Sequence, residues 1–310
     1  MKKRKACMKI SIVIPTYNRE HLLKETINAM LKQTFQNFEI VIVDNCSVDN
    51  TEQMIQAFND SRIRYFKNQN NGIFAINRNL GIRQTTGEFI AFSDDDDIWL
   101  PDKLEKQLLE FEKDENIGLV CTNGVLYYQN QDGKKIGKSS DRYISFKKLL
   151  KNNVIICSSA MVKKSVLNEV GVFIENRDFV AGEDYELWLR IAKKFKVRYI
   201  GIPLVKYRIH QAAYQNIFLV GEKTLTLNDR IYQNLLKENL IDKRVYKNLI
   251  QNLNYKKVFS LIVNHDASLS LELINKTEID FWKKCKLLLM FFSDNVKVLN
   301  IFRRMNQSFS

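Results

Sequence analysis

FSDDDDIWLP, residues 92–101, places four adjacent aspartates directly after an apolar run. Neighbouring carboxylates repel one another, so such a run is favourable where a positive group lies among them. Mg²⁺ and Mn²⁺ prefer carboxylate oxygens and commonly keep positions open for substrate phosphate. A helix cap is the alternative, because Asp97 and Asp102 precede a helical pattern with Pro101 in its first turn. The place of the run in the fold decides between these two interpretations.

Short β-branched runs alternate with helical periodicity between residues 10 and 92. One face of the first helical segment carries Leu22, Leu23, Thr26, Ile27, Met30 and Leu31. Further helices are expected near 49–58 and 73–84. The expected strands are ISIVIP, FEIVIVD, RIRYF and EFIAFS. Strands that are apolar at consecutive positions and separated by helices predict a parallel sheet with both faces covered. This half of the chain is expected to be doubly wound, like a nucleotide-binding fold.

Polar clusters follow three of these strands. PTYNRE follows the first strand, DNCSVDN the second and SDDDD the fourth. In open α/β sheets, ligands bind beyond the carboxyl ends of the strands. The three clusters are therefore expected to meet at one edge of the sheet, which favours ligand binding by the aspartates over a simple helix cap.

The chain after the aspartates has a less regular pattern. Strands are expected at IGLVCTN, VLYYQ, SSAMV, VRYIG and LVKYRIH, with a turn at NQDGKK and a helix at GEDYELWLRIAKKF. Mixed strands here predict a second half that completes a cleft. The remaining residues show helical patterns without a carboxylate cluster or a Gly-rich loop. The predicted organisation is a basic tail at 1–8, a catalytic domain at 9–210 and a helical accessory region at 211–310.

The second acidic motif is GEDYELWLR, residues 182–190, at the start of an amphipathic helix. Carboxylates are stabilised at a helix N-terminus by the helix dipole, and this alone can explain Glu183 and Asp184. The functional interpretation makes Asp184 a general base that deprotonates an incoming hydroxyl.

Composition limits the classes of function. The 310 residues are 45% apolar, which supports a proper core, and the net charge of +13 favours nucleic acid, anionic lipid or a phosphorylated small molecule as partner. Five dispersed cysteines without a CxxC spacing suggest neither a disulfide framework nor a zinc site, so a reducing cytoplasm is the simplest compartment. No apolar run approaches the roughly 18–20 residues that a transmembrane helix needs.

Three other classes of protein compete for these features. A Rossmann dehydrogenase is excluded because no GxGxxG follows the first strand. A nucleic-acid-binding protein would need interleaved aromatic and basic residues or a recognised motif, and neither is present. A nucleotidyltransferase would need a Gly-rich phosphate loop near the first strand, where PTYNRE stands instead. The last two remain as alternatives.

The ordered succession of motifs resembles glycosyltransferase family 2, inverting enzymes of the GT-A fold. The resemblance covers about residues 9–210 and rests on ISIVIPTYNRE, FEIVIVDNCSVDNT, NNGIFAINRNLGIRQTTGEFIAFSDDDDIWLPDKLEKQ, GEDYELWLR and YRIH. It implies a mixed α/β sheet with helices on both faces, here with a C-terminal helical extension. It also implies transfer of a hexosyl or N-acetylhexosaminyl group from a nucleotide-diphosphate sugar, with inversion, to a glycan or lipid-linked acceptor in cell-surface polysaccharide biosynthesis.

The resemblance assigns a set of residues to the donor site. Asp44 matches the first acidic position of the family's VDDxS pattern, and Asn45 stands at the second, which leaves uridine and deoxythymidine donors open with a UDP-sugar expected. Arg78 matches the arginine of the NxGxxxARN segment, although the Gly-to-Arg spacing is one residue longer here. The residues expected to bind the nucleotide sugar are Pro15, Thr16, Tyr17, Arg19, Asp44, Asn45, Asn70, Gly72, Arg78, Asp94 and Asp95.

The resemblance likewise assigns the metal and the chemistry. Asp94, Asp96 and His210 are expected to hold a divalent metal, Mn²⁺ or Mg²⁺, that bridges the diphosphate and neutralises its charge as it departs. Asp184 matches the general base of the family's ED motif, and Glu183 is its catalytic neighbour. The metal would then be the positive group expected among the four aspartates of residues 94–97.

A basic, apolar segment lies near the C-terminus at residues 280–307. Basic amphipathic helices can lie on an anionic membrane surface, or they can pack on the catalytic domain with a solvated basic face. The protein is accordingly expected to be cytoplasmic and peripheral on the inner face of the cell membrane. The basic head before Met8 contributes only if translation starts at Met1. The sugar, the acceptor, the linkage and the oligomeric state stay open.

Overall fold

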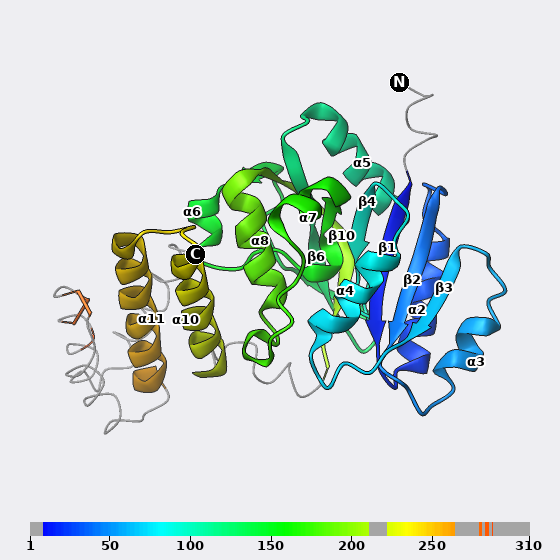
Figure 1. The fold of residues 1–310 in the computed structure, drawn as a ribbon, viewed down its shortest axis with the longest axis horizontal. Helices are drawn as coiled ribbons and strands as arrows, with labels where there is room; N and C mark the ends of the chain where they lie inside the picture. The colour runs from blue at the N-terminus through cyan, green and yellow to red at the C-terminus, as the bar shows by residue number, and fades with distance from the viewer. Residues whose placement is uncertain (1–8, 211–221, 264–278, 281–282, 285–286, 288–310) are drawn as a thin grey trace. The chain divides into compact units, whose positions relative to one another are not determined.

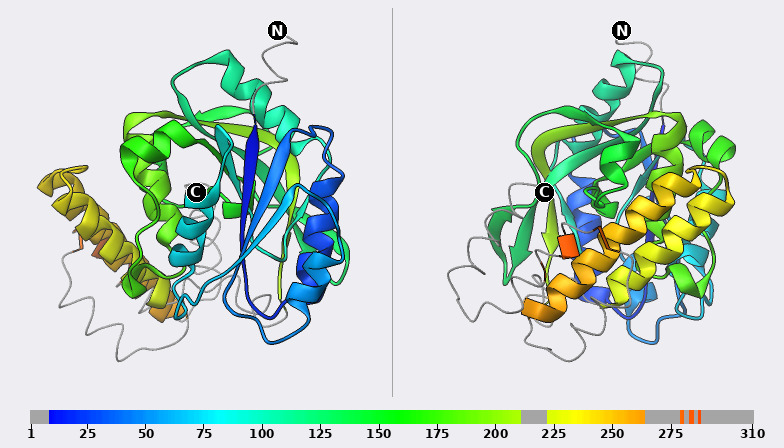
Figure 2. Two further views of the ribbon diagram at one scale, coloured as in Figure 1. Left: turned by 45° about the vertical axis from the view of Figure 1, so that its right-hand side comes forward. Right: turned by 90° about the vertical axis from the view of Figure 1, so that its left-hand side faces the viewer.

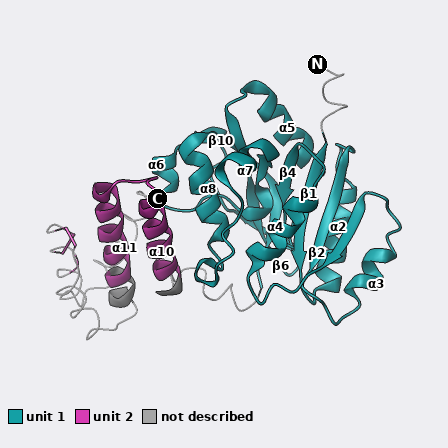
Figure 3. Ribbon diagram, viewed as in Figure 1, with its two compact units in different colours: residues 1–214 teal, residues 215–310 magenta. Residues whose placement is uncertain are grey.

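A computed structural model of the protein describes residues 9–210, 222–263, 279–280, 283–284 and 287. They belong to two compact units, residues 1–214 and 215–310 (Figure 3). The expected basic tail at 1–8 and most of the expected C-terminal basic helix lie outside the described residues. The domain boundaries drawn from the sequence stay a prediction.

Four parallel strands form the N-terminal half of the sheet (Figure 1), in the order β3-β2-β1-β4. Every residue of β1 and β2 is buried, as expected for strands that are covered on both faces. The strands confirm the four predicted from the sequence. Their bounds are Ile10–Thr16 for β1, Phe38–Asp44 for β2, Ile63–Lys67 for β3 and Phe89–Phe92 for β4.

Helices cover both faces of this half, and the left view of Figure 2 places α2 and α4 on opposite sides of the strands. Ile12 of β1 shares one buried core with Leu23 and Ile27 of α2. On the other face, a Cβ at Gly81 of α4 would lie 2.5 Å from Val13 Cγ1, so only glycine permits this close helix–strand contact. The helices are α2 (Glu20–Leu31), α3 (Thr51–Gln56) and α4 (Phe74–Gln84).

The second half makes the sheet mixed. β9 runs antiparallel to both β4 and β6, β10 runs parallel to β6, and β5 pairs antiparallel with β10. The order of the main path is β3-β2-β1-β4-β9-β6-β10-β5, with β7 on β6 and β8 on β10. The added strands are β5 (Ile98–Trp99), β6 (Ile117–Tyr128), β7 (Gln131–Lys135), β8 (Arg142–Ile144), β9 (Met161–Lys163) and β10 (Lys196–Arg208).

Four helices and two short 3-10 turns complete this unit. Helices α5 and α8 pack on β6 and β10, and α6 and α7 pack against α8. Their bounds are Lys103–Lys113 for α5, Phe146–Leu149 for α6, Lys164–Val170 for α7 and Glu183–Lys194 for α8, with 3-10 turns at Cys157–Ser159 and Arg177–Phe179.

Three details of the second half differ from the sequence-based expectation. IGLVCTN and VLYYQ form one long strand, β6, and VRYIG and LVKYRIH form β10, in which a register shift on either side of Pro203 absorbs the proline. The predicted turn NQDGKK lies earlier: Gln129 and Asn130 have φ values of 48° and 61°, and the QDGKK residues form β7. Two successive left-handed residues make a tight hairpin turn, so Gly133 is not needed for it.

The second unit contains two described helices, α10 (Glu222–Lys237) and α11 (Lys243–Val263), which pack against each other. Leu235 and Leu253 are among their buried apolar side chains. Among the described residues, no helix combines the length and the apolar character needed to cross a bilayer.

Candidate active site

The aspartate loop, residues 94–97, connects β4 to β5. Thr26 Oγ1 of α2 donates hydrogen bonds to the carbonyls of Asp95 (3.1 Å) and Asp97 (2.9 Å), which fixes the backbone of the loop. Asp97 is buried and its Oδ1 accepts the backbone N–H of Arg208 at 2.8 Å. Asp97 therefore anchors the loop to β10. Asp94, Asp95 and Asp96 contact side chains of other loops and helices instead.

The PTYNRE loop after β1 meets the aspartate loop directly. Thr16 Oγ1 donates to Asp95 Oδ2 at 2.8 Å, and Arg19 Nη1 lies 2.9 Å from both Asp95 Oδ1 and Asp96 Oδ2. Burial raises the pKa of Asp95 to about 6, with Arg19 opposing the rise and Asp96 adding to it. The first and third polar clusters thus converge, as the parallel topology predicts.

The end of β10 brings an imidazole to the same loop. His210 Nε2 lies 2.8 Å from Asp96 Oδ2, and Arg208 Nε donates to the carbonyl of Asp96 at 2.8 Å. A carboxylate oxygen beside an imidazole nitrogen suits Mn²⁺ or Mg²⁺, whose remaining positions are commonly filled by phosphate oxygens and water. Asp94 is not part of this pair, and no three potential metal ligands cluster within the residues that the structure describes.

Arg78 joins the aspartate loop to the second acidic motif. Its buried guanidinium places Nη2 2.7 Å from Asp94 Oδ1, and Nη1 donates to Glu183 Oε1. It also lies over the ring of Phe173, 5.6 Å from the centroid. That Arg78 faces the nucleotide stays a prediction, and in the structure its guanidinium bridges these two carboxylates. A buried cation between two anions holds both in fixed positions.

Asp184 lies in the first turn of α8, beside Glu183. Its Oδ1 accepts the backbone N–H of Tyr185 at 2.6 Å, and its side chain is partly exposed. Burial and the neighbouring charge of Glu183 raise the pKa of Asp184 to about 7, against the lowering effect of Arg78. A carboxylate that titrates near neutral pH suits a general base.

The other expected donor-site residues tie the neighbouring loops together. Asp44, at the end of β2, accepts hydrogen bonds from Ser47 Oγ at 2.6 Å and Tyr65 Oη at 2.5 Å. Asn45 Oδ1 accepts the backbone N–H of Asn70 at 2.7 Å. These side chains are thus engaged within the protein and shape the edge of the sheet.

Three further residues of the expected set occupy the same edge in different ways. Asn70 Oδ1 accepts the N–H of Gly72 at 2.9 Å, and the positive φ of Gly72, 78°, closes this turn. Pro15 lies within β1 in register with Val43 of β2. The ring of Tyr17 is half exposed and free to meet a ligand.

Tyr207 is a further residue of the site that the sequence motifs do not single out, although it belongs to the YRIH segment. It is 40% exposed, and burial together with Asp97, Asp94, Asp96 and Asp184 raises its pKa well above the usual value. The phenol therefore lies close to both acidic motifs. Tyr207 lies on β10, three residues before His210. This closeness to a predicted site residue was the signal in the sequence that pointed to it.

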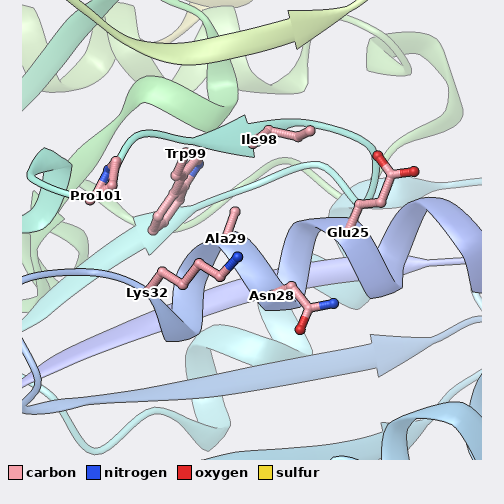
Figure 4. Close-up of a pocket in the computed structure, with 7 residues that line it drawn as sticks. All are labelled: Glu25, Asn28, Ala29, Lys32, Ile98, Trp99 and Pro101. Carbon is pink, nitrogen blue, oxygen red and sulfur yellow. The ribbon is translucent and has the colours of Figure 1, made fainter. Parts of the chain in front are cut away.

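The pocket of Figure 4 is separate from these residues. It has a volume of about 340 Å³, lies between α2 and β5, and contains none of the side chains predicted for the site. Glu25 on its rim pairs with Arg208 at 2.6 Å. The lining residues are Glu25, Asn28, Ala29, Lys32, Ile98, Trp99 and Pro101.

Comparison with known proteins identifies the family. The family described as Glycosyl transferase family 2 matches residues 11–171. The chain belongs to glycosyl transferase family 2. One family relative is UDP-Glc:alpha-D-GlcNAc-diphosphoundecaprenol beta-1,3-glucosyltransferase WfgD of Escherichia coli, 36% identical over 207 residues, or 66% of this chain and 78% of WfgD.

Solved structures confirm the GT-A fold expected from the sequence. S. aureus TarS 1-349 in complex with UDP-GlcNAc matches with a TM-score of 0.62 and 19% identity, over 79% of this chain and 71% of that one. The mannosyltransferase PcManGT from Pyrobaculum calidifontis, in complex with GDP-Man and Mn2+, matches with a TM-score of 0.58 and 16% identity, over 90% and 78%. At these identities the likeness concerns the fold.

Proposed function

We propose that this family 2 member is an inverting glycosyltransferase that moves a sugar from a UDP-sugar to a hydroxyl of a glycan or lipid-linked acceptor. The observation that carries the proposal is the Arg78 bridge, because it holds Asp94 of the aspartate loop and Glu183 beside Asp184 in one connected site. The choice of donor is supported by WfgD, whose name refers to UDP-Glc, and by the TarS complex with UDP-GlcNAc.

Asp184 is the base of the proposed reaction. Its carboxylate takes the proton of the acceptor hydroxyl while the acceptor oxygen forms a bond to the anomeric carbon. The bond between that carbon and the diphosphate oxygen breaks, and the nucleoside diphosphate leaves with the electron pair. One displacement on the opposite face inverts the anomeric configuration. Glu183 pairs with Arg78 and so helps to fix the first turn of α8, which carries Asp184.

The donor is proposed to lie along the edge formed by the loops after β1, β2 and β4. The half-exposed ring of Tyr17 is available to stack on the base. Arg19 already faces Asp95 and Asp96, where it can also meet diphosphate oxygens. When bound, Mn²⁺ or Mg²⁺ would neutralise the charge that develops on the leaving diphosphate, with Asp96 and His210 as the residues proposed to hold it, since Asp94 is held by Arg78.

The proposed setting is polysaccharide synthesis at the cytoplasmic face of the cell membrane. Support comes from the lipid-diphosphate acceptor in the name of WfgD and from the net charge of +13. The protein would then be peripheral, and it would release the nucleoside diphosphate on the cytoplasmic side.

A nucleotide-sugar panel tests the donor site. Each donor is added to the full chain with Mn²⁺, Mg²⁺ or chelator, and thermal stabilisation and slow donor hydrolysis are recorded. We expect stabilisation by one UDP-sugar that requires metal and is lost in Asp96→Ala. Asp102→Ala, a partly exposed aspartate at the start of α5 that pairs with Lys106, is the control and should respond to the donors like wild type. Stabilisation that is equal in Asp96→Ala and wild type would contradict the proposed site.

A further inference from the structure

A strongly basic segment, residues 134–151, crosses the surface of the catalytic unit. We name it the basic ribbon. It contains a single acidic residue, Asp141. Its cations are Lys134, Lys135, Lys138, Arg142, Lys147, Lys148 and Lys151.

The ribbon follows the two long strands of the second half, away from the end that carries the site. β7 starts it by pairing Lys135 with Val125 of β6, and Gly137 then donates its N–H to Asn123 Oδ1 at 2.8 Å. Further along, β8 pairs Arg142 with Tyr199 of β10. The hairpin before the ribbon is held near the site end of β10, because its Asp132 lies 2.7 Å from Lys206.

Six of the seven cations of the ribbon, all except Lys151, have no acidic partner in the described part of the chain. Among the described residues, Lys134, Lys135, Lys138, Arg142, Lys147 and Lys148 form no ion pair with an acidic side chain. Asp141 is already engaged by Arg198 Nη2 at 3.3 Å and by the N–H of Gly201 at 2.8 Å. Lysines elsewhere on this unit do find partners: Lys113 pairs with Glu110 at 2.5 Å.

Three of these cations lie close enough to repel one another. Limited burial and the charges of Arg142 and Lys138 lower the pKa of Lys148. The Nε of Arg142 is buried and has no hydrogen-bond partner among the described residues. Like charges that converge without an acid destabilise the folded protein unless an anion lies over them. The ribbon therefore fits a partner with many negative charges.

Exposed apolar side chains lie on and beside the ribbon. Ile136 is 43% exposed and Tyr143 50%. Ile202, 49% exposed, follows Gly201, where a Cβ would lie 2.4 Å from the backbone of Ser139. Apolar and aromatic groups among cations are typical of surfaces that lie at the headgroup level of a bilayer. The cations would also attract nucleic acid, but nucleic acid would make no use of the exposed Ile136 and Ile202 side chains.

We propose that the basic ribbon binds the surface of an anionic phospholipid membrane, with Ile136, Tyr143 and Ile202 entering the headgroup region. This surface is distinct from the C-terminal segment and belongs to the unit that carries the site. The inference rests on the membrane setting of the proposed function and adds the surface that makes the contact, and binding to lipid can be measured without donor or turnover. Failure of either proposal can thus be distinguished from failure of the other.

Vesicle flotation with the full chain tests the ribbon. The vesicles are pure phosphatidylcholine or contain roughly one third phosphatidylglycerol. The test variant is Lys134→Gln/Lys135→Gln/Lys138→Gln, and the matched control, which removes equal charge from exposed lysines elsewhere, is Lys24→Gln/Lys32→Gln/Lys113→Gln. All six lysines are exposed, but Lys113 pairs with Glu110, so the melting temperatures of both variants are compared with that of wild type before binding is measured. The partition coefficient is measured at low and at physiological salt.

We expect wild type and the control variant to bind the anionic vesicles, more weakly at higher salt, and to ignore the neutral ones. The ribbon variant should bind on the order of 100-fold more weakly at low salt. Ile202→Ser should bind several-fold more weakly while keeping its salt dependence. Equal losses in the ribbon and control variants, or binding to a single-stranded oligonucleotide in preference to vesicles, would overturn the proposal.

Discussion

The loops of the two halves of the catalytic unit differ in how strongly side-chain contacts hold them. In the N-terminal half the loops are tied to one another by side chains, as in Thr16 to Asp95 and Asn45 to the backbone of Asn70. In the second half, every residue from 129 to 141 is exposed. The loops proposed to bind the donor are thus held in place by the protein's own side chains, while the second half presents an exposed surface. Arg78 is one of the contacts that join the two halves, and it is the one that connects the two acidic motifs.

Asp184→Asn should have the largest effect, because it removes the proposed base on the open side and leaves the donor side intact. We expect kcat to fall by about 10²–10⁴ while donor binding stays within twofold, roughly, of wild type. Turnover and calorimetric donor binding are measured on the same preparation. Asp178→Asn, an exposed aspartate in the 3-10 turn before α8, is the control and should be fully active. An active Asp184→Asn enzyme would remove the base assignment.

Arg78→Lys breaks the link between the halves. A lysine ammonium is a point charge and cannot span Asp94 and Glu183 as the planar guanidinium does. We expect kcat and donor affinity to fall together, kcat by about 10², and stability to fall by about 1–3 kcal/mol. Arg83→Lys, on the exposed side of the same helix, controls for general helix effects. If only one of the two kinetic parameters changes, the halves are not coupled through Arg78.

The pH dependence of turnover tests whether Asp184 is the group that must lose its proton before the reaction. Burial and Glu183 raise the pKa of Asp184 to about 7, and a base acts only when deprotonated. Below pH 7 we therefore expect kcat to fall about tenfold per pH unit, and above it to level off. The kcat profile is recorded from pH 5 to 9 with saturating donor, and the residual rate of Asp184→Asn should lose this dependence. A flat wild-type profile across pH 6–8 would argue against Asp184 as the titrating group.

Glu39→Gln should affect the stability of the donor half without changing the chemistry. Burial alone would raise the pKa of Glu39, but hydrogen bonds from Ser11, Thr86 and Arg64 outweigh it and lower the pKa to about 2. The carboxylate thus stabilises the fold above about pH 4.5, and this stabilisation is lost as the pH falls toward 2. We expect the variant to lose about 1–3 kcal/mol of unfolding free energy at pH 7.

Urea unfolding at pH 7 and pH 4 measures this loss, with the exposed Glu88→Gln as control. The difference between wild type and Glu39→Gln should shrink at the lower pH, and kcat per folded enzyme should be unchanged. A difference that grows toward acid pH would mean that Glu39 is not held as a stabilised carboxylate.

The donor half could be predicted from sequence because its signals are local. Consecutive apolar residues identify β1 and β2, and the parallel topology alone brings Thr16 to Asp95. The bridge of Arg78 to Glu183 could not be predicted, because the two residues are 105 positions apart and their pairing depends on the crossing of the whole sheet. The hairpin β7 was missed because Gly133 suggested the turn, whereas two left-handed residues before it make the turn.

The anomeric configuration of the product shows whether the sugar is transferred with inversion, as a single displacement with Asp184 as base requires. Once the panel names a donor, transfer to a simple acceptor is followed by NMR, and the coupling constant of the new anomeric proton is read before any later reaction. With an α-linked UDP-sugar we expect a β-linked product, because the acceptor that Asp184 deprotonates attacks the face opposite the departing diphosphate. An α-linked product would contradict a single displacement with Asp184 as base.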